Sequence, residues 1–178
     1  RCLLGLLLLL TAWLAVAQAR ILGINFLLSV LTLVWMADVA AYFAGRAWGG
    51  RWIGRKLAAQ ISPGKSWEGA IGGAFGVLML GLVWSAVESG MQLPLAERSL
   101  QGQLLAQHGL WTMLLALLFL SAMSVVGDLL ESLLKRSAGV KDSSGLLPGH
   151  GGVLDRVDAL LPVLPLAMML VAFSRSGA

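Results

Sequence analysis

The chain has 178 residues, of which 58% are hydrophobic and only 12% are charged. An average soluble domain has about 25% charged residues, so this composition excludes a soluble globular protein and indicates an integral membrane protein. The formal net charge of +4 suits the anionic headgroups of a membrane surface, and we expect no nucleic-acid partner. The single cysteine, Cys2, excludes an internal disulfide and a thiolate metal cluster.

Five apolar stretches approach the length of about 20 residues that a helix needs to cross a hydrocarbon core of about 30 Å. We predict spanning helices at 2–18, 22–44, 68–88, 110–131 and 158–174. The expected fold is therefore all-α: a polytopic membrane protein with one helical domain over residues 1–178. Since Arg1 is not an initiator methionine and the apolar run follows at once, we expect further spans upstream. A cleaved signal peptide is the weaker interpretation.

Cations are concentrated in two of the predicted connections. Nine of the thirteen Lys and Arg residues lie there: Arg46, Arg51, Arg55, Lys56, Lys65, Lys135, Arg136, Lys141 and Arg156. Because cytoplasmic loops carry an excess of Lys and Arg, both connections are predicted to be cytoplasmic and residues 89–109 to form an external loop. We therefore expect a polar cavity that is open to the cytoplasm. We expect the protein to lie in a cell inner membrane or plasma membrane.

Glycines mark the start of the third predicted span. Gly69 with Gly73, and Gly72 with Gly76, form two small-xxx-small pairs, which let a neighbouring helix approach closely. Packing within the chain is the simpler interpretation, and a homodimer through this face is the second hypothesis.

An acidic and a basic residue share one face of the second predicted span. Asp38, Tyr42 and Arg46 follow one another at intervals of four residues, so they lie along one side of the helix. Two interpretations remain open: a structural Asp38–Arg46 pair, or side chains that line a polar cavity.

The fourth and fifth predicted spans both present carboxylates near the cytoplasmic side. Ser124, Asp128, Glu131 and Lys135 form one stripe on the fourth span, and Asp155 and Asp158 begin the fifth; all of them must face a protein interior or a water-filled cavity. Such carboxylates suit Mg²⁺, although a proton relay or a sodium site would use the same acids.

The segment between these two spans favours phosphate chemistry. Its donors are Lys135, Arg136, Lys141, Arg156, Ser143, Ser144 and the amide groups around Gly149, Gly151 and Gly152. Cations, hydroxyl groups and glycine amides together bind anions, and nucleotidyl or phosphoryl transfer needs them beside metal-binding acids. We reject a P-loop at Gly64-Lys65-Ser66, because that motif needs a preceding strand and a glycine at position 59, where this chain has Ala59.

The run from Ser132 to Asp158 reads S-x-L-K-R-x-x-x-x-K-D-x-S-x-x-L-P-G-H-G-G-x-x-D-R-x-D and closely resembles the signature of the phosphatidate cytidylyltransferases. ADVAAYFAGRAWG and SPGKSWEG resemble upstream motifs of the same family, so the resemblance covers about residues 35–161. The chain departs from the family at Gly64, where a lysine is usual, and this leaves Lys65 to act alone.

The resemblance implies that CTP and phosphatidic acid react to CDP-diacylglycerol and pyrophosphate with one or two Mg²⁺ ions, within surrounding membrane lipids. Asp128 and Asp155 are expected to face each other as metal ligands, with Glu131, Asp158 and Asp38 in a second site or second shell. Lys135 and Lys141 are expected to act in catalysis. The expected phosphate-binding residues are Lys65, Arg136, Ser143, Ser144, His150, Gly151, Gly152 and Arg156, with Arg46 assisting.

Three alternatives remain. His150 could cap a turn rather than contact a phosphate. A CTP-dependent polyprenol or lipid kinase would use the same metal, cations and membrane location, and a cation-coupled transporter would use the same intramembrane acids.

Overall fold

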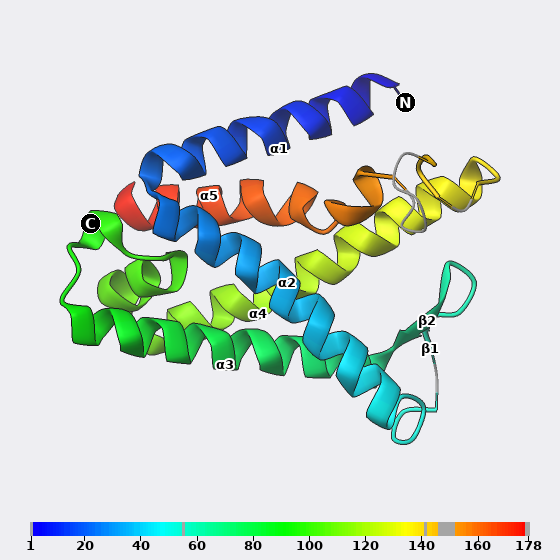
Figure 1. The fold of residues 1–178 in the computed structure, drawn as a ribbon, viewed down its shortest axis with the longest axis horizontal. Coiled ribbons are helices and arrows are strands. Elements are labelled where there is room, and N and C mark those ends of the chain that lie inside the picture. Colours follow the sequence, from blue (N-terminus) through cyan, green and yellow to red (C-terminus); the bar gives the residue numbers. More distant parts are fainter. Residues whose placement is uncertain (1, 55, 141, 146–151, 177–178) are drawn as a thin grey trace.

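The protein is described here from a computed structural model that covers residues 2–54, 56–140, 142–145 and 152–176. Its helices are α1 (Cys2–Leu22), α2 (Ile24–Trp48), α3 (Trp67–Met91), α4 (Leu100–Ser137) and α5 (Leu160–Ser176), with a hairpin of β1 (Lys56–Ala58) and β2 (Ser62–Ser66) and short 3₁₀ turns η1 (Leu95–Glu97) and η2 (Leu154–Arg156). Helices α1 to α4 each contain a stretch long and apolar enough to cross a membrane, and α5 is a shorter apolar helix. The prediction of an all-α, multi-pass membrane protein is thus confirmed (Figure 1).

Helices α2 and α3 pack in close contact through the glycines predicted for this purpose. A Cβ atom on Gly72 would collide with the Cβ of Ala44, and one on Gly76 would come within 2.5 Å of the Cβ of Ala40. A Cβ on Gly73 would lie 2.8 Å from the carbonyl oxygen of Ala37. This face therefore packs against α2 of the same chain, which is the simpler of the two interpretations from the sequence.

A second close approach joins α4 to the start of α5. A Cβ atom on Gly127 would lie 2.8 Å from Cγ of Pro162 and 2.9 Å from the carbonyl oxygen of Asp158. Only glycine lets these two backbones meet at this level. The contact brings Asp158 to the same level as Asp128 of α4.

Residues 89–109 were predicted to form an external loop, and the structure corrects this. Helix α4 already begins at Leu100, and its first part is interrupted only at Gly109, whose φ of 82° is non-helical. The connection after α3 is tied down by Glu88, which is 3% exposed and accepts hydrogen bonds from the Ser99 backbone N–H at 2.8 Å and from Asn25 at 2.6 Å. The connection after α3 is therefore shorter than predicted, and residues 99–104 are buried at the start of α4 instead of lying in a loop.

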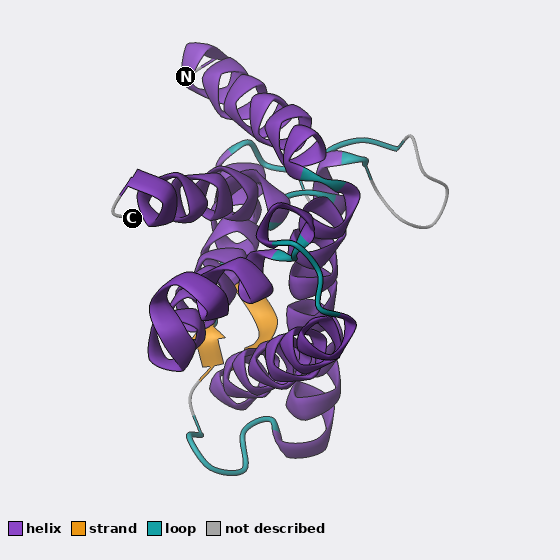
Figure 2. Ribbon diagram, turned by 90° about the vertical axis from the view of Figure 1, so that its left-hand side faces the viewer, coloured by secondary structure: helices purple, strands orange, loops and turns teal. Residues whose placement is uncertain are grey.

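The hairpin between α2 and α3 is the one β-structure in the described ranges (Figure 2). Its strands are antiparallel, with Lys56 opposite Ser66 and Ala58 opposite Ser62. In Figure 1 it lies at the end of the bundle where α4 also ends and α5 begins. Both cation-bearing connections therefore lie at one end of the molecule. Two connections on the same side of a membrane, as predicted from the sequence, must lie at the same end of the bundle.

Candidate active site

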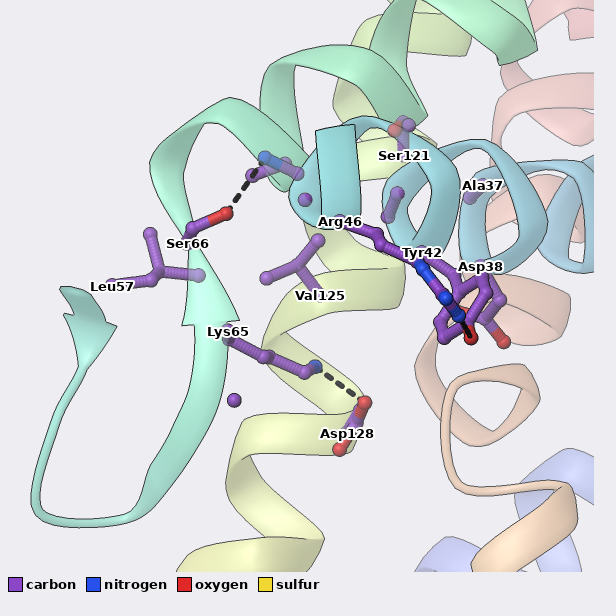
Figure 3. Close-up of a pocket in the computed structure, with 16 residues that line it drawn as sticks. Ala37, Asp38, Tyr42, Arg46, Leu57, Lys65, Ser66, Ser121, Val125 and Asp128 are labelled. Atoms are coloured by element: carbon purple, nitrogen blue, oxygen red, sulfur yellow. Dashed lines mark hydrogen bonds and ion pairs between the residues drawn. The ribbon is translucent and has the colours of Figure 1, made fainter. Parts of the chain in front are cut away.

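A cavity of about 460 Å³ lies between α2, α3, α4 and β2. Its charged or hydroxyl-bearing lining residues are Asp38, Tyr42, Arg46, Lys65, Ser66, Ser121 and Asp128, and small or apolar residues make up the rest of its wall. Figure 3 shows labelled side chains from α2, α4 and the hairpin gathered around it. Three of the sequence-predicted site residues, Asp38, Lys65 and Asp128, are thus brought to one cavity.

Lys65 and Asp128 form an ion pair across this cavity (Figure 3). The side chains remain 24% and 32% exposed, so both can still reach a ligand. Strand β2 positions Lys65, and the next residue, Ser66, caps α3 by accepting a hydrogen bond from the Gly69 N–H at 3.1 Å. Because this cap sets where α3 begins, it also sets the place of Lys65 beside α4.

Arg46 donates to the Tyr42 hydroxyl at 3.0 Å, one turn back on α2. Asp38 forms no ion pair with Arg46 within the described part of the chain, and its side chain is exposed towards the cavity. Of the two interpretations from the sequence, the structure therefore favours side chains that line a polar cavity.

Asp158 adds a further carboxylate near the same place. Burial raises the pKa of Asp158 above its usual value, and the negative charges of Asp128 and Asp38 raise it further. Mutual repulsion of this kind arises where carboxylates converge without enough cations to neutralise them. The region between α2, α4 and η2 is therefore a place where an added cation would be stabilised.

A second cluster is centred on Lys135. Its ammonium group lies 2.6 Å from Asp155 and 2.7 Å from Glu131, one turn back on α4. Glu131 is only 6% exposed, and it also interacts with Asp155 and Asp158. The charged side chains predicted to share one face of α4 therefore point into the protein and not towards lipid, where nothing would solvate them.

Asp155 also organises the loop before it. It accepts hydrogen bonds from the Ser143 N–H at 3.0 Å, the Ser143 hydroxyl at 2.9 Å and the Gly152 N–H at 2.7 Å. Burial disfavours its charge, but Lys135 and these backbone donors outweigh that effect and hold the pKa of Asp155 well below its usual value. Asp128 and Asp155, expected to face each other, thus take part in two separate ion-paired clusters.

The remaining predicted residues are distributed around the second cluster. Arg136 lines a smaller cavity of about 140 Å³ together with Lys135 and Asp142. Ser144 is half-buried, and Arg156 is exposed in η2. Lys141, His150 and Gly151 lie outside the described residues.

Carboxylates are also the ligands that a Mg²⁺ site would need. Within the described residues, no group of three or more His, Cys, Asp or Glu side chains forms a preformed metal site. Mg²⁺ is usually bound by one or two carboxylates together with waters and substrate phosphates rather than by a closed protein cage. Asp38 and Asp128 line the open cavity beside Lys65, and the charges of both act on Asp158, so carboxylates of the type that Mg²⁺ prefers are present in this region.

Sequence reasoning missed two residues. Glu68, 3% exposed, accepts from the backbone N–H groups of Trp52 and Ile53 at 3.1 and 3.0 Å and so holds the loop after α2; an acid in the first turn after a capping serine is the signal. Ser121 lines the cavity seven residues before Asp128, and extending the predicted stripe by one turn would have included it.

The sequence model of the cytidylyltransferase family matches residues 2–174. Among curated proteins, the phosphatidate cytidylyltransferase of Haemophilus influenzae is 45% identical over 143 residues, covering 80% of this chain and 44% of that protein. The phosphatidate cytidylyltransferase of Pseudomonas aeruginosa is 42% identical over 176 residues, covering 98% of this chain and 58% of that protein. The one of Bacillus subtilis is 39% identical over 150 residues, covering 84% of this chain and 48% of that protein.

The fold and the site define a polytopic helical membrane protein with a charged cavity at one end. The chain belongs to the cytidylyltransferase family. It spans about half the length of the curated relatives it matches.

Proposed function

We propose that the protein transfers a cytidylyl group from CTP to phosphatidic acid, giving CDP-diacylglycerol and pyrophosphate in phospholipid synthesis. The observation that carries this proposal is the family match over residues 2–174, together with relatives named phosphatidate cytidylyltransferase. Cytoplasmic orientation of the cavity in a cell inner or plasma membrane belongs to the same proposal, because both substrates must reach one end of the bundle.

In this reaction an oxygen of the phosphatidate phosphate forms a bond to the α-phosphorus of CTP. The bond from the α-phosphorus to the bridging oxygen breaks, and pyrophosphate leaves with that electron pair. No general base is required, since the attacking phosphate is already ionised. The protein must therefore position two polyanions and neutralise the charge that develops on the leaving group.

The two lysine-centred clusters suit these tasks. Lys65 and Arg46 lie on the cavity wall and would contact phosphate oxygens. Lys135 and Arg136 lie beside the loop that Asp155 holds through Ser143 and Gly152, where a triphosphate would approach.

Mg²⁺ would be held by Asp128 and by its neighbours Asp38 and Asp158, with Asp155 and Glu131 as further ligands from the second cluster. When bound, it supplies positive charge to the phosphate oxygens during transfer. The convergence of these carboxylates and the raised pKa of Asp158 support this assignment.

The test is turnover of the purified protein with Mg²⁺, phosphatidate and CTP labelled at either the α- or the γ-phosphate. We expect the α-label in the lipid and the γ-label in pyrophosphate. Asp128→Asn should lower turnover by about a hundredfold or more, because losing a metal ligand removes several kcal/mol of transition-state stabilisation. Glu97→Gln, at an exposed position in η1, is the matched control and should keep full activity.

Two results would overturn the proposal. Transfer of the γ-label to lipid would instead identify a CTP-dependent lipid kinase. Cation flux into liposomes without nucleotide, in the absence of any labelled lipid product, would identify a transporter.

A further inference from the structure

The cavity has two chemically different halves. Its charged half contains Lys65, Arg46 and Asp128, at the end of the bundle that carries the loops. The other half is lined mainly by small or apolar residues of three helices, together with Asp38: Ala37 and Ala41 of α2, Gly69, Ala70 and Gly73 of α3, and Val125 of α4. A ligand with one charged end and one largely apolar end suits this lining.

Ser121 is a polar residue in the apolar half. It is only 2% exposed yet lines the cavity, and no hydrogen bond joins its hydroxyl to another described residue. A helical serine usually donates to the carbonyl of the preceding turn, as Ser29, Ser85 and Ser89 do here. Because Ser121 lines the cavity, its hydroxyl is placed to donate a hydrogen bond to an acceptor atom of a bound ligand.

The position of Ser121 indicates which ligand atom that would be. Ser121, Val125 and Asp128 are spaced four and three residues apart on one face of α4, and seven residues of helix rise by about 10 Å. Ser121 therefore lies deeper in the span than the charged half, on the far side of Val125 in Figure 3. A glycerolipid phosphate has this order of groups: an anionic phosphate, then ester carbonyls a few bonds away, then acyl chains.

We propose that Ser121 donates a hydrogen bond to an ester carbonyl of the lipid substrate, and that Val125 limits the space for the first carbons of its acyl chain. This inference rests on the proposed function, because it assigns the lipid-binding half of the same site. It makes Ser121 a residue that distinguishes ester-linked from ether-linked lipids. The ether analogue keeps the phosphate and chains but lacks the carbonyl acceptor.

The test compares binding of dioctanoyl phosphatidate with binding of its dialkyl ether analogue, each titrated against the detergent-purified protein by intrinsic tryptophan fluorescence without CTP. The unaltered protein should bind the ester about threefold to tenfold more tightly, as expected for one hydrogen bond. Ser121→Ala should reduce this ratio to about one, with little change in binding of the ether. Ser124→Ala is the matched control, since Ser124 is 1% exposed on the same helix but does not line the cavity, and it should keep the preference.

A second pair of variants tests the space in the apolar half. Val125→Phe should fill the cavity and weaken binding of both lipids by about tenfold or more, because overpacking costs about 1–3 kcal/mol. Val126→Phe adds the same side chain at the neighbouring position, which is 47% exposed and lies outside the cavity lining, and it should bind normally.

These experiments distinguish a wrong assignment of Ser121 from a wrong assignment of the reaction. If CDP-lipid is formed but Ser121→Ala keeps the full ester preference, the assignment of Ser121 is wrong and the proposed function stands. If the protein shows no preference for the ester at all, the inference is also wrong. If the lipids bind as described but the α-label of CTP never enters lipid, the pocket is correct and the proposed reaction is not.

Discussion

Two lysines organise the charged end of the molecule, and each neutralises carboxylates from another part of the chain. Lys65 pairs with Asp128, and Lys135 pairs with both Glu131 and Asp155. Intramembrane charges are costly unless they are paired, so these pairs let the acids stay near bilayer depth. Lys65 and Asp128 remain partly exposed, so this pair stays accessible from the cavity.

Asp155→Asn tests the structural part of this arrangement through its pH dependence. The folded-state pKa of Asp155 is depressed, so its contribution to stability is complete above the unfolded value of about 3.9 and is lost as the pH falls towards the folded value. The variant should therefore have a lower Tm than the unaltered protein at pH 7, and the difference should shrink below about pH 4. Thermal unfolding followed by circular dichroism between pH 3 and pH 8 measures this.

Asp142→Asn is the control for this experiment, because Asp142 is an exposed acid in the same loop. Its Tm should follow that of the unaltered protein at every pH. A Tm difference for Asp155→Asn that grows on acidification would contradict the assigned role of this carboxylate.

Among these residues, the sequence predicted partners within one helix better than partners between segments. Spacing on one helix was sufficient to bring Glu131 and Lys135 together, since helical periodicity is local. Lys65 lies 63 residues before Asp128, and no local pattern can pair residues so far apart. The placement of Asp128 and Asp155 in different clusters is a tertiary result for the same reason.

Helices α2 and α3 form the wall of the cavity, and their contact depends on glycine. The small-xxx-small pattern predicted a close helix contact, and the structure identifies the partner as α2. Because the cavity lies along this seam, widening the seam should disturb both packing and the position of the residues that line it.

Gly72→Ala and Gly90→Ala provide a matched pair within α3. The new Cβ at position 72 would collide with Ala44, whereas at position 90 nothing lies within 4 Å. We expect Gly72→Ala to destabilise the protein by about 1–3 kcal/mol through overpacking. Gly90→Ala should be neutral or stabilising by up to about 1 kcal/mol, since alanine favours helix. Unfolding in detergent, titrated with a denaturant, measures both; equal effects would contradict the close α2–α3 contact.

The segment 89–109 illustrates where element prediction failed. Its low charge and its position between apolar spans suggested an external loop, but Leu100, Gln101 and Leu104 are buried in the first part of α4. Gln103 and Arg98 are joined by a hydrogen bond from the Gln103 side chain to the Arg98 carbonyl at 2.9 Å. Buried polar side chains of this kind look like loop residues in a sequence, because their partners are made only by folding.

For the molecule as a whole, the two cation-bearing connections lie at the same end of the bundle (Figure 1). The positive-inside rule predicts that this end faces the cytoplasm. The turn that contains Leu95 lies at the other end of α3 and should face outward.

Cysteine labelling in intact cells tests this orientation. With Cys2 replaced by serine, Gln60→Cys places a single thiol at the exposed tip of the hairpin, and Leu95→Cys places one at a 42% exposed site in η1. A membrane-impermeant maleimide should label Leu95→Cys in intact cells and Gln60→Cys only after permeabilisation. The opposite pattern would invert the topology and place the cavity on the wrong side for CTP.

The sequence by itself determined the class of protein, the approximate spans, the helix-packing glycines and the types of side chain at the site. These features depend on composition and on local periodicity, which a linear chain displays directly. Only the tertiary structure decided that Lys65 pairs with Asp128, that Asp155 holds its loop, and that Ser121 lies in an apolar cavity wall. The physical reason is that pairing and burial depend on distances between segments, and those distances exist only after α2, α3, α4 and the hairpin have packed together.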